Sequence, residues 1–534
     1  MQSIKEILIQ KFLSVATPLQ VESFIESVFE SISSKSEIRE LYEIICGCEM
    51  SHKNIEAILE VSEWEYLHGN MESLCKYIYL LYKKTNTKSL QKYYFDLLYK
   101  NNEITAEELE SFRLENGKTT ECIIDSKRVN KYNNETILYN YSGIEKEYGI
   151  YSFSDKIGLN MTLLKTPYGA IIFDCGAKIE SYGTAMISLE DIKCFLKAFN
   201  LTVEDVVAVV ISHAHLDHYG SINSLVKVGI EKSKIYIEDI TKMLISEASR
   251  EDYLINDYSS IDSFHYPNKK MEIIPFRNGH ILGSNGYIVH FDNQNVVFTG
   301  DFCLHNQPIV NGLNIEDIIS EPYIKEYGVS CLITETTYGN KNTILSSEEA
   351  TEVFKHFVEL IIANDYKVFI PSFAIGRSQE IAYLLRGNKI LIDGLAVAIT
   401  HTYQRCVENI RIFDNNTHFA TAEIEDKIRN FDLHDVIVAS SGMISENSTS
   451  YNYISEFLKS KDNVCIIKSG FISSESMGDM LLKEWKGDNN IVLDIPLSAH
   501  ASKDEIVELI NKLDPDKVVL IHGDGLDVSY SDVE

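Results

Sequence analysis

One segment of the chain has an unusual density of reactive side chains, and it reads Ser212-His213-Ala214-His215-Leu216-Asp217-His218. The segment directly follows Val206 to Ile211, an apolar and β-branched run that is typical of a buried strand. Histidine and aspartate are rarely buried without partners, so packing alone explains this cluster poorly. Histidines at alternate positions can point to one side of an extended loop, while Asp217 and His218 continue toward a neighbouring point. The spacing therefore predicts a loop that supplies ligands to two adjacent metal ions.

Three other segments place a histidine or an aspartate beside glycine and near a predicted strand. Phe173-Asp174-Cys175-Gly176 ends one apolar run, Phe298-Thr299-Gly300-Asp301 ends another, and Gly279-His280 lies between these two along the chain. Taken singly, such residues are more often structural than metal-binding. The order in which they stand around the 212–218 segment is what the resemblance described next interprets.

The order of these segments resembles the motif series of the metallo-β-lactamase superfamily. The 212–218 segment matches the HxHxDH signature of that family, and the segment ending at Gly176 matches its first motif, whose aspartate orients the ligand loop. Gly279-His280 and Gly300-Asp301 then correspond to the next histidine and to the bridging aspartate. The resemblance implies a layered α/β fold and hydrolysis at a two-metal site.

Further segments resemble the nucleic-acid-processing branch of this superfamily that is called β-CASP. Glu335-Thr336-Thr337-Tyr338-Gly339 looks like motif A of the branch, Ser498-Ala499-His500-Ala501 like motif B, and Ile521-His522-Gly523-Asp524 like motif C. The stretches 371–380 and 440–443 resemble two parts of its cap domain. The resemblance begins at about Leu138 and covers nothing before that residue. One departure is the stretch 474–479, which is acidic where the branch often carries an arginine.

Carried over to these positions, the resemblance implies one metal held by three histidines, a second held by an aspartate and two histidines, and one aspartate that bridges both. The ligands are His213, His215 and His280 for the first metal, Asp217, His218 and His522 for the second, and Asp301 as the bridge. This set suits two Zn²⁺, with Mn²⁺ as the alternative. Two such cations would activate a hydroxide for in-line attack on a phosphodiester.

The departing oxygen of such a reaction needs a proton, and the resemblance assigns this task to His500. Pairing with the carboxylate of Glu335 would keep His500 protonated near neutral pH. The predicted catalytic side chains are therefore Asp217, Glu335 and His500. Arg377, in the cap stretch, suits a substrate phosphate because a guanidinium grips two oxygens, and it suits equally a tie to a carboxylate of the protein.

The elements that must position these residues follow from the pattern of apolar residues. Short β-branched and aliphatic runs predict strands at Met161 to Leu164, Ala170 to Phe173 and Val206 to Ile211. Helical spacing predicts helices at Ser188 to Phe199, Ala350 to Ala363 and Ser502 to Leu513. Alternating strands and helices indicate an α/β layered fold.

The same patterns divide the chain into three parts. Residues 1–125 show helical spacing and predict an all-helical N-terminal domain, and a polar stretch up to Glu135 predicts a linker. We expect a metallo-β-lactamase αββα sandwich at 136–339 and 491–534, with an inserted β-CASP cap domain at 340–490.

The composition of the 534 residues, 45% apolar and 24% charged, is that of an ordinary globular protein. The net charge of −30 excludes a surface that attracts nucleic acid over its whole extent, although a local groove or bound cations can still hold a phosphate. No apolar stretch approaches the ~20 residues that span a bilayer, and Met1 to Phe12 lacks the features of a signal peptide. Ten scattered cysteines without a CxxC pair suit reduced thiols, so we expect a cytoplasmic protein without membrane contact.

These observations predict a metal-dependent ribonuclease that hydrolyses phosphodiester bonds of single-stranded RNA. RNA is favoured over DNA because motif C carries His522, where DNA-processing members of the branch usually have an aliphatic residue. A DNA nuclease of the same fold and a catalytically silent RNA-binding subunit are the alternatives. The acidic charge and the helical N-terminal region suggest a protein partner, and a homo-oligomer is left open.

Overall fold

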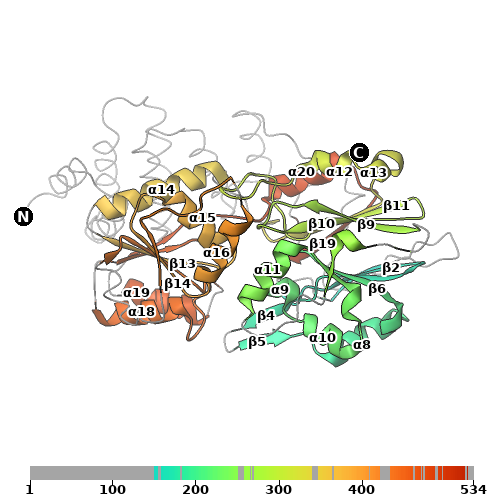
Figure 1. Ribbon diagram of the computed structural model, residues 1–534, viewed down its shortest axis with the longest axis horizontal. Helices are drawn as coiled ribbons and strands as arrows, with labels where there is room; N and C mark the ends of the chain where they lie inside the picture. Colours follow the sequence, from blue (N-terminus) through green and yellow to red (C-terminus); the bar gives the residue numbers. More distant parts are fainter. Residues whose placement is uncertain are drawn as a thin grey trace, which may run out of the picture.

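The computed structural model describes residues 149–526, apart from 154–157, 181–182, 250–257, 265, 267–269, 340–346, 364–365, 408, 421–432, 461–463, 471, 473–475, 488–490, 496 and 524–525. The predicted helical domain at 1–125 and the linker behind it lie outside the described residues. Strands and helices alternate through the described chain in a mixed α/β fold, as the sequence predicts (Figure 1). Within these ranges every helix is too short or too polar to cross a membrane.

Two facing sheets form one half of the described structure, with strand orders β1-β2-β3-β6-β7-β8 and β19-β12-β11-β10-β9. The first consists of β1 (Gly149–Ser152), β2 (Thr162–Thr166), β3 (Gly169–Phe173), β6 (Val206–Ile211), β7 (Ile235–Ile237) and β8 (Ser259–Ser260). The second consists of β9 (Met271–Arg277), β10 (Asn285–Phe291), β11 (Gln294–Phe298), β12 (Cys331–Thr336) and β19 (Val518–Gly523). A separate hairpin pairs β4 (Ala177–Glu180) with β5 (Gly183–Met186). Strand β6 coincides with the predicted run and is apolar throughout because both of its faces are covered.

Helices cover the outer faces of these two sheets, which gives four layers in the order helix, sheet, sheet, helix (Figure 1). Apolar side chains fill the space between the sheets, and the rings of Phe173 and Phe298 stack there with centroids 4.4 Å apart. The outer helices are α8 (Leu189–Ala198) and α10 (Ile222–Val228) on the first sheet, and α12 (Ile315–Ile319), α13 (Pro322–Tyr327) and α20 (Lys503–Leu513) on the second. Helices α8 and α20 lie within two residues of their predicted bounds.

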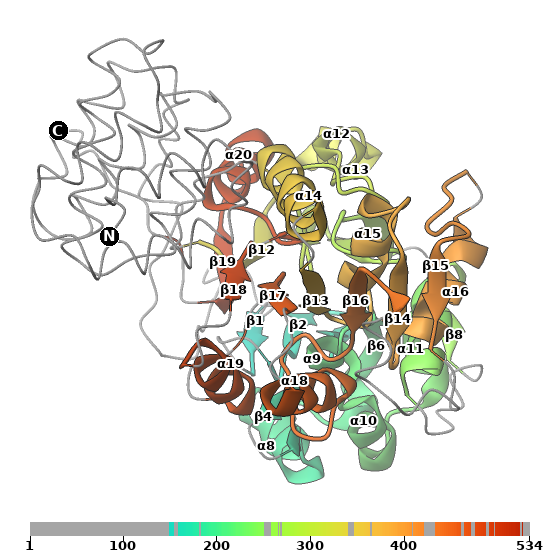
Figure 2. The same cartoon turned by 90° about the vertical axis from the view of Figure 1, so that its left-hand side faces the viewer.

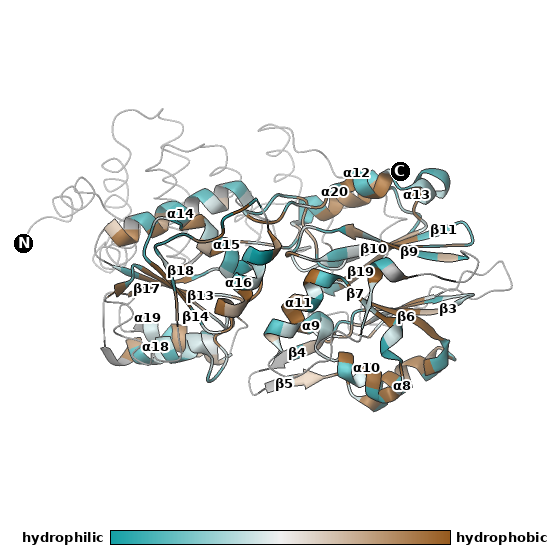
Figure 3. Cartoon of the chain, viewed as in Figure 1, coloured by the Kyte–Doolittle hydropathy of each residue, from teal (hydrophilic) through white to brown (hydrophobic). Residues whose placement is uncertain are grey.

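A third sheet is formed by an insertion between β12 and β19, which are parallel neighbours in the second sheet. Its strand order is β15-β14-β16-β13-β17-β18, and every neighbouring pair is parallel. The strands are β13 (Lys367–Pro371), β14 (Ile390–Asp393), β15 (Thr417–Phe419), β16 (Val436–Ala439), β17 (Val464–Lys468) and β18 (Ile491–Asp494). Parallel strands that are covered on both faces need apolar side chains, and β13 and β17 accordingly appear hydrophobic in Figure 3.

Helices cover both faces of this cap sheet (Figures 1 and 2). One face carries α14 (Ser347–Ala363), α15 (Arg377–Leu384) and α16 (Ala396–Cys406), and the other carries α18 (Thr449–Ser460) and α19 (Met477–Gly487). The predicted cap boundary at residue 490 falls before the last strand of the sheet, since β18 pairs with β17. An apolar run of four residues reads the same in either sheet, so the sequence pattern could not assign β18. The division of the chain into domains otherwise stays a prediction.

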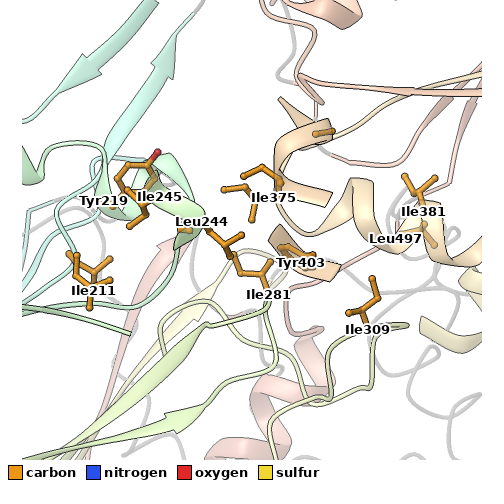
Figure 4. Packing of buried hydrophobic residues seen from close by; sticks show 14 of the residues in the cluster. Ile211, Tyr219, Leu244, Ile245, Ile281, Ile309, Ile375, Ile381, Tyr403 and Leu497 are labelled. Atoms are coloured by element: carbon orange, nitrogen blue, oxygen red, sulfur yellow. The ribbon is translucent and has the colours of Figure 1, made fainter. Parts of the chain in front are cut away.

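The cap packs directly against the loop that carries His280. Figure 4 shows Ile281 of this loop near Ile375 and Tyr403 of the cap, within one continuous group of buried apolar side chains. The backbone N–H of Leu282 donates to the Tyr403 hydroxyl at 3.4 Å. A Cβ on Gly376 would lie only 2.7 Å from the Ile281 side chain. The position of this loop is therefore coupled to the position of the cap.

Candidate metal centre

The predicted ligands lie where strands of the two central sheets end. Strands β3 and β6 are parallel neighbours, and Asp174 and the 212–218 segment follow directly after them. Strands β11, β12 and β19 are also successive parallel neighbours, and their ends carry Asp301, Glu335 and His522. Because the carboxyl ends of parallel strands meet at one edge of a sheet, the side chains of both sheets converge.

A β-bulge directs His522 into this edge. Strands β12 and β19 pair in register up to Glu335 and Ile521, and then the register shifts so that Thr336 faces Gly523. His522 is the extra residue, and its backbone φ of 55° lies in the left-handed region. A bulge re-aims a side chain relative to the regular alternation of the strand, so this one places an imidazole where the pleat would not.

Asp174 fixes the ligand loop through hydrogen bonds to its carboxylate. Its carboxylate accepts hydrogen bonds from the backbone N–H of Ser212 at 2.7 Å and from the Ser212 hydroxyl at 2.9 Å. The same carboxylate lies 2.8 Å from Nδ1 of His218. Nδ1 of His218 is therefore the donor to Asp174, which orients the ring so that Nε2 faces the predicted metal site.

Three histidines and Asp301 form a first group of donor atoms. Nε2 of His213 and Nε2 of His280 each lie 3.0 Å from Nδ1 of His215. Oδ2 of Asp301 lies 3.7 Å from the first of these Nε2 atoms and 3.8 Å from the second. Four ligands placed ~2.0–2.1 Å from a tetrahedral ion are separated by about 3.3 Å, so this group has the dimensions of a single zinc site.

Asp217, His218 and His522 form a second group beside the first. Oδ2 of Asp217 lies 3.6 Å from Nε2 of His218 and 3.3 Å from Nε2 of His522. Oδ2 of Asp301 lies 3.1 Å from Nε2 of His218. The structure thus brings together all seven side chains predicted as ligands, with Asp301 between the two groups.

Asp301 has the chemistry expected of a shared ligand. It is buried, and its Oδ1 accepts no hydrogen bond from the described residues, although Nδ1 of His522 lies 3.3 Å away. Burial alone would raise the pKa of this carboxyl, but the charges of His218 and His522 outweigh it and hold the pKa well below the ordinary value. A buried carboxylate oxygen without a donor is costly unless a cation compensates it, so the residues present fit bound metal ions.

The protonation of the histidines also fits this role. Burial lowers the pKa of His213, His215 and His280, so these three imidazoles are neutral and offer a lone pair. His218 differs: burial would lower its pKa, but the carboxylates of Asp301 and Asp217 raise it well above the ordinary value. Binding of an ion by this second group would therefore release a proton.

His500 lies at the edge of both groups, against Glu335. Nδ1 of His500 is 2.9 Å from Oε2 of Glu335 and 3.9 Å from Oδ2 of Asp301. Glu335 is buried, and it also accepts hydrogen bonds from the Phe302 N–H at 2.8 Å and from the Thr337 hydroxyl. Burial alone would lower the pKa of His500, but the charge and hydrogen bond of Glu335 outweigh it and raise the pKa to about 9. A protonated and partly exposed imidazole thus lies beside the ligand groups.

The cap contributes a backbone carbonyl to the site. The carbonyl of Ile375 lies 3.3 Å from Nε2 of His215, which leaves Nδ1 of this histidine facing His213 and His280. Arg377, at the start of α15, donates to Oε2 of Glu380 at 2.5 Å, and both side chains are almost fully buried. Of the two roles predicted for Arg377, this ion pair supports the tie to a carboxylate, with its partner in the same helix.

Three polar residues that contact the ligands were not among the site residues predicted from the sequence. Nδ2 of Asn160 lies 3.2 Å from Nε2 of His218, and Nε2 of Gln307 donates to the backbone carbonyl of His280 at 2.7 Å. The hydroxyl of Thr337 lies 2.9 Å from Nδ1 of His522. Only Thr337 had a signal, because it lies within motif A, two residues after Glu335. Asn160 and Gln307 come from loops in which amides are common.

Two segments of the chain match known protein families. Residues 157–314 match the metallo-β-lactamase superfamily, and residues 491–527 match the Zn-dependent metallo-hydrolase RNA specificity domain. The first match contains six of the seven predicted ligands, and the second contains His522 and also His500. These matches confirm the resemblance that the sequence motifs indicate.

Three similar proteins have names that describe nucleic-acid processing. The "Probable RNase MJ4" of Methanocaldococcus jannaschii is 25% identical over 417 residues, covering 69% of this chain and 91% of that protein. The "RNase aCSPSF2" of Saccharolobus solfataricus is 25% identical over 391 residues, covering 66% of this chain and 74% of that protein. The "Cleavage and polyadenylation specificity factor subunit 3" of Dictyostelium discoideum is 24% identical over 428 residues, covering 70% of this chain and 53% of that protein.

Proposed function

We propose that this chain, which carries a metallo-β-lactamase domain and an RNA specificity domain, is a metal-dependent ribonuclease that hydrolyses phosphodiester bonds of single-stranded RNA. The observation that carries the proposal is the position of His500. This imidazole is paired with buried Glu335 and lies 3.9 Å from Asp301, where two groups of metal-ligand side chains meet. Phosphodiester hydrolysis needs both a metal site and a nearby proton donor, and this arrangement supplies the side chains for each.

The two donor groups divide the ligands between two ions. We assign His213, His215 and His280 to one ion, Asp217, His218 and His522 to the other, and Asp301 to both. Imidazole and carboxylate ligands suit Zn²⁺, and Mn²⁺ accepts the same set. When bound, the two cations would supply Lewis acidity, lowering the pKa of a water molecule and offsetting the charge of the phosphate.

The side chains around these ligands have separate tasks. Asp174 keeps His218 oriented through Nδ1, and the Ile375 carbonyl does the same for His215 through Nε2. His500 donates a proton to the departing oxygen: its Nδ1 is held by Glu335, so the proton for transfer is the one on Nε2. Glu335 keeps this imidazole protonated through charge and orientation. Positive charge on bound ions would lower the pKa of His500 from about 9 toward neutrality, which favours transfer.

The RNA specificity domain and the ribonuclease names of the relatives support RNA over DNA as the substrate. A DNA nuclease of the same fold is the alternative within this enzyme class. A silent RNA-binding subunit is disfavoured, because every predicted ligand is present and the ligands converge.

We infer the remaining assignments from the sequence. The αββα part carries the metal site, and residues 1–125 form the helical part that would bind a protein partner or a second copy. The cap, predicted at 340–490 and extended here to the end of β18 because that strand pairs with β17, closes one side of the metal site. We place the protein in the cytoplasm on the basis of its scattered cysteines and its composition.

The central experiment uses the full chain loaded with Zn²⁺ and 5′-labelled single strands of RNA and DNA with the same sequence. We expect shortened RNA products, little DNA cleavage, and loss of both with a strong chelator. Intact RNA after incubation with protein that holds two ions per chain would favour the silent binding subunit. Equal cleavage of DNA would assign the chain to the alternative nuclease class.

Two variants separate the proton donor from the ligands. His500→Ala should keep both ions and lose the ~10²–10⁴-fold that general acid catalysis commonly supplies. His280→Ala should lose metal and activity together. A nitrophenyl phosphodiester, whose leaving group departs without a proton, should partly rescue His500→Ala and leave His280→Ala inactive. Metal loss in His500→Ala would instead make this histidine a ligand.

A further inference from the structure

We propose that His305 is a positioning residue that fixes the backbone of His500, and with it the proton donor, relative to the metal site. This inference rests on the proposed function, because it takes His500 as the donor to the leaving group. His305 lies in the loop after β11, four residues beyond Asp301, and none of the sequence motifs includes it. Its Nε2 lies 3.2 Å from the carbonyl oxygen of Ser498, and its Nδ1 lies 2.9 Å from Oε1 of Glu505.

Both partners of His305 are hydrogen-bond acceptors. A carbonyl oxygen and a carboxylate can only accept, so each ring nitrogen of His305 must donate a proton. The imidazole is therefore held from two sides, with no freedom to rotate away from Ser498. The raised pKa of His305 agrees with this: burial would lower it, but the hydrogen bond and charge of Glu505 outweigh the effect.

Ser498 passes this constraint on to His500. The Ser498 hydroxyl accepts a hydrogen bond from the His500 N–H at 3.0 Å and donates to the His500 carbonyl at 2.9 Å. The next carbonyl, that of Ala499, lies 2.8 Å from Nδ1 of His280. The turn that carries His500 is thus held at two successive carbonyls, by His305 on one side and by a predicted metal ligand on the other.

Glu505 anchors His305 to a rigid element. Its Oε1 also accepts from the N–H groups of Leu304 at 3.0 Å and His305 at 2.7 Å, and its Oε2 accepts from the Ser502 N–H at 2.8 Å. Glu505 belongs to the first turn of α20, which packs on the second sheet (Figure 1). The chain of contacts therefore runs from α20 through His305 and Ser498 to the proton donor.

Helix α20 does not itself need His305. Ser502 and Glu505 already form a capping box at its N-terminus, in which each side chain accepts a hydrogen bond from the other's backbone. What His305 adds is the donor to the Ser498 carbonyl, which points to a role at the active site rather than in helix stability.

The test uses two replacements of His305, each of which keeps one of its two hydrogen bonds, to Ser498 or to Glu505. The amide of His305→Gln can reach the position of Nε2 and donate to Ser498, whereas the amide of His305→Asn corresponds to Nδ1 and reaches only Glu505. We expect His305→Asn to lower RNA cleavage by about 10–100-fold, since ångström-scale misplacement of a reacting group can cost about this much, and His305→Gln to remain within about threefold of wild type. With a nitrophenyl phosphodiester both variants should stay within about threefold, because that leaving group needs no proton.

A double-mutant cycle tests the route through His500. In a His500→Ala background, His305→Asn should have no further effect on RNA cleavage, because the group that it positions is gone. The matched control is His290→Asn, a buried histidine on β10 that contacts Asn295 and stacks on Tyr323. This change should leave the ratio of rates on the two substrates at its wild-type value. Metal stoichiometry should remain at the wild-type level in the His305, His500 and His290 variants.

Several results would overturn the inference. The first is equal RNA cleavage by His305→Asn and His305→Gln, and the second is an equal loss of rate on RNA and on the nitrophenyl phosphodiester. The others are loss of metal in His305→Asn, and additive effects of His305→Asn and His500→Ala in the double-mutant cycle. If His305→Asn does not fold by circular dichroism, Ser498→Ala removes the next link and must show the same selective loss on RNA. If His500→Ala itself shows no selective loss, the proposed proton donor is wrong and this inference falls with it. If His500→Ala shows the selective loss of RNA cleavage and His305→Asn does not, the proposed proton donor stands and only the positioning role of His305 is refuted.

Discussion

Gly176 packs against the backbone of the ligand loop so closely that a single methyl group should displace two predicted ligands. A Cβ at this position would lie 1.5 Å from the carbonyl oxygen of Asp217 and 2.9 Å from the backbone nitrogen of His218. Non-bonded carbon and oxygen atoms need roughly 3.5 Å, so Gly176→Ala must separate the two segments by about 2 Å. The Cys175 N–H donates to the His218 carbonyl at 2.8 Å, so this separation also breaks a backbone hydrogen bond.

The displacement should act on one donor group more than on the other. Asp217 and His218 belong to the second group, and the three atoms nearest to the added Cβ all belong to these two residues. We expect Gly176→Ala to bind about one ion per chain in place of two, and to lower RNA cleavage by at least ~10²-fold, since even an ångström of misplacement can cost that much. Elemental analysis and initial rates on labelled RNA measure the two effects.

The control for this prediction is Gly328→Ala. A Cβ on Gly328 would meet nothing within 4 Å, but its φ of 70° makes alanine strained there, at a cost of about 1–2 kcal/mol. This control should lower the free energy of unfolding and keep both ions and the full rate. Two ions and a wild-type rate in Gly176→Ala would refute the reasoning, because they would mean that the loop yields without moving the ligands.

Three further predictions concern the shared ligand, the His305 ion pair and the cap. Asp301→Ala should abolish hydrolysis and lower the metal stoichiometry, because both donor groups lose a carboxylate; turnover at the wild-type rate would place the site elsewhere. The pair of His305 and Glu505 should stabilise the fold most between pH 4.5 and 6.5, the ordinary values of its two groups. Because the pKa of His305 is raised in the folded state, its contribution to the free energy of unfolding is lost as the pH rises through this raised pKa. Because the pKa of Glu505 is lowered, its contribution is lost as the pH falls through the lowered pKa. Urea unfolding of the wild type and of Glu505→Gln, from below pH 4.5 to above pH 6.5, measures the difference in the free energy of unfolding, which should be largest inside this window and shrink on both sides of it; a difference that is constant with pH would contradict the prediction. Trp485→Ala removes a fully buried ring that packs near Phe457 in the cap. It should lower the free energy of unfolding by about 3–5 kcal/mol, which a urea titration measures. Metal binding serves as a separate measurement of the half of the structure that carries the metal site.

The residues that could be identified from the sequence are those whose roles depend on local spacing. His213, His215, Asp217 and His218 lie in one loop, so their spacing along the chain already limits where their side chains can point. The strand before them and helices α8, α14 and α20 follow from runs of apolar residues with a regular period. Motif order then indicated the resemblance to the superfamily, which the matches over residues 157–314 and 491–527 confirm.

Tertiary structure alone decided the features that depend on the pairing of distant segments. The bulge that turns His522 inward exists because β12 and β19 pair across the whole cap insertion, and no period in either strand encodes that shift in register. The contacts of the Ile375 carbonyl with His215 and of His305 with Ser498 are likewise absent from any local pattern. A hydrogen bond between residues nearly two hundred positions apart leaves no trace in the spacing of either. Residue type and order therefore predicted which chemistry the chain can perform, while the folded arrangement decided which neighbours hold each reacting group in place.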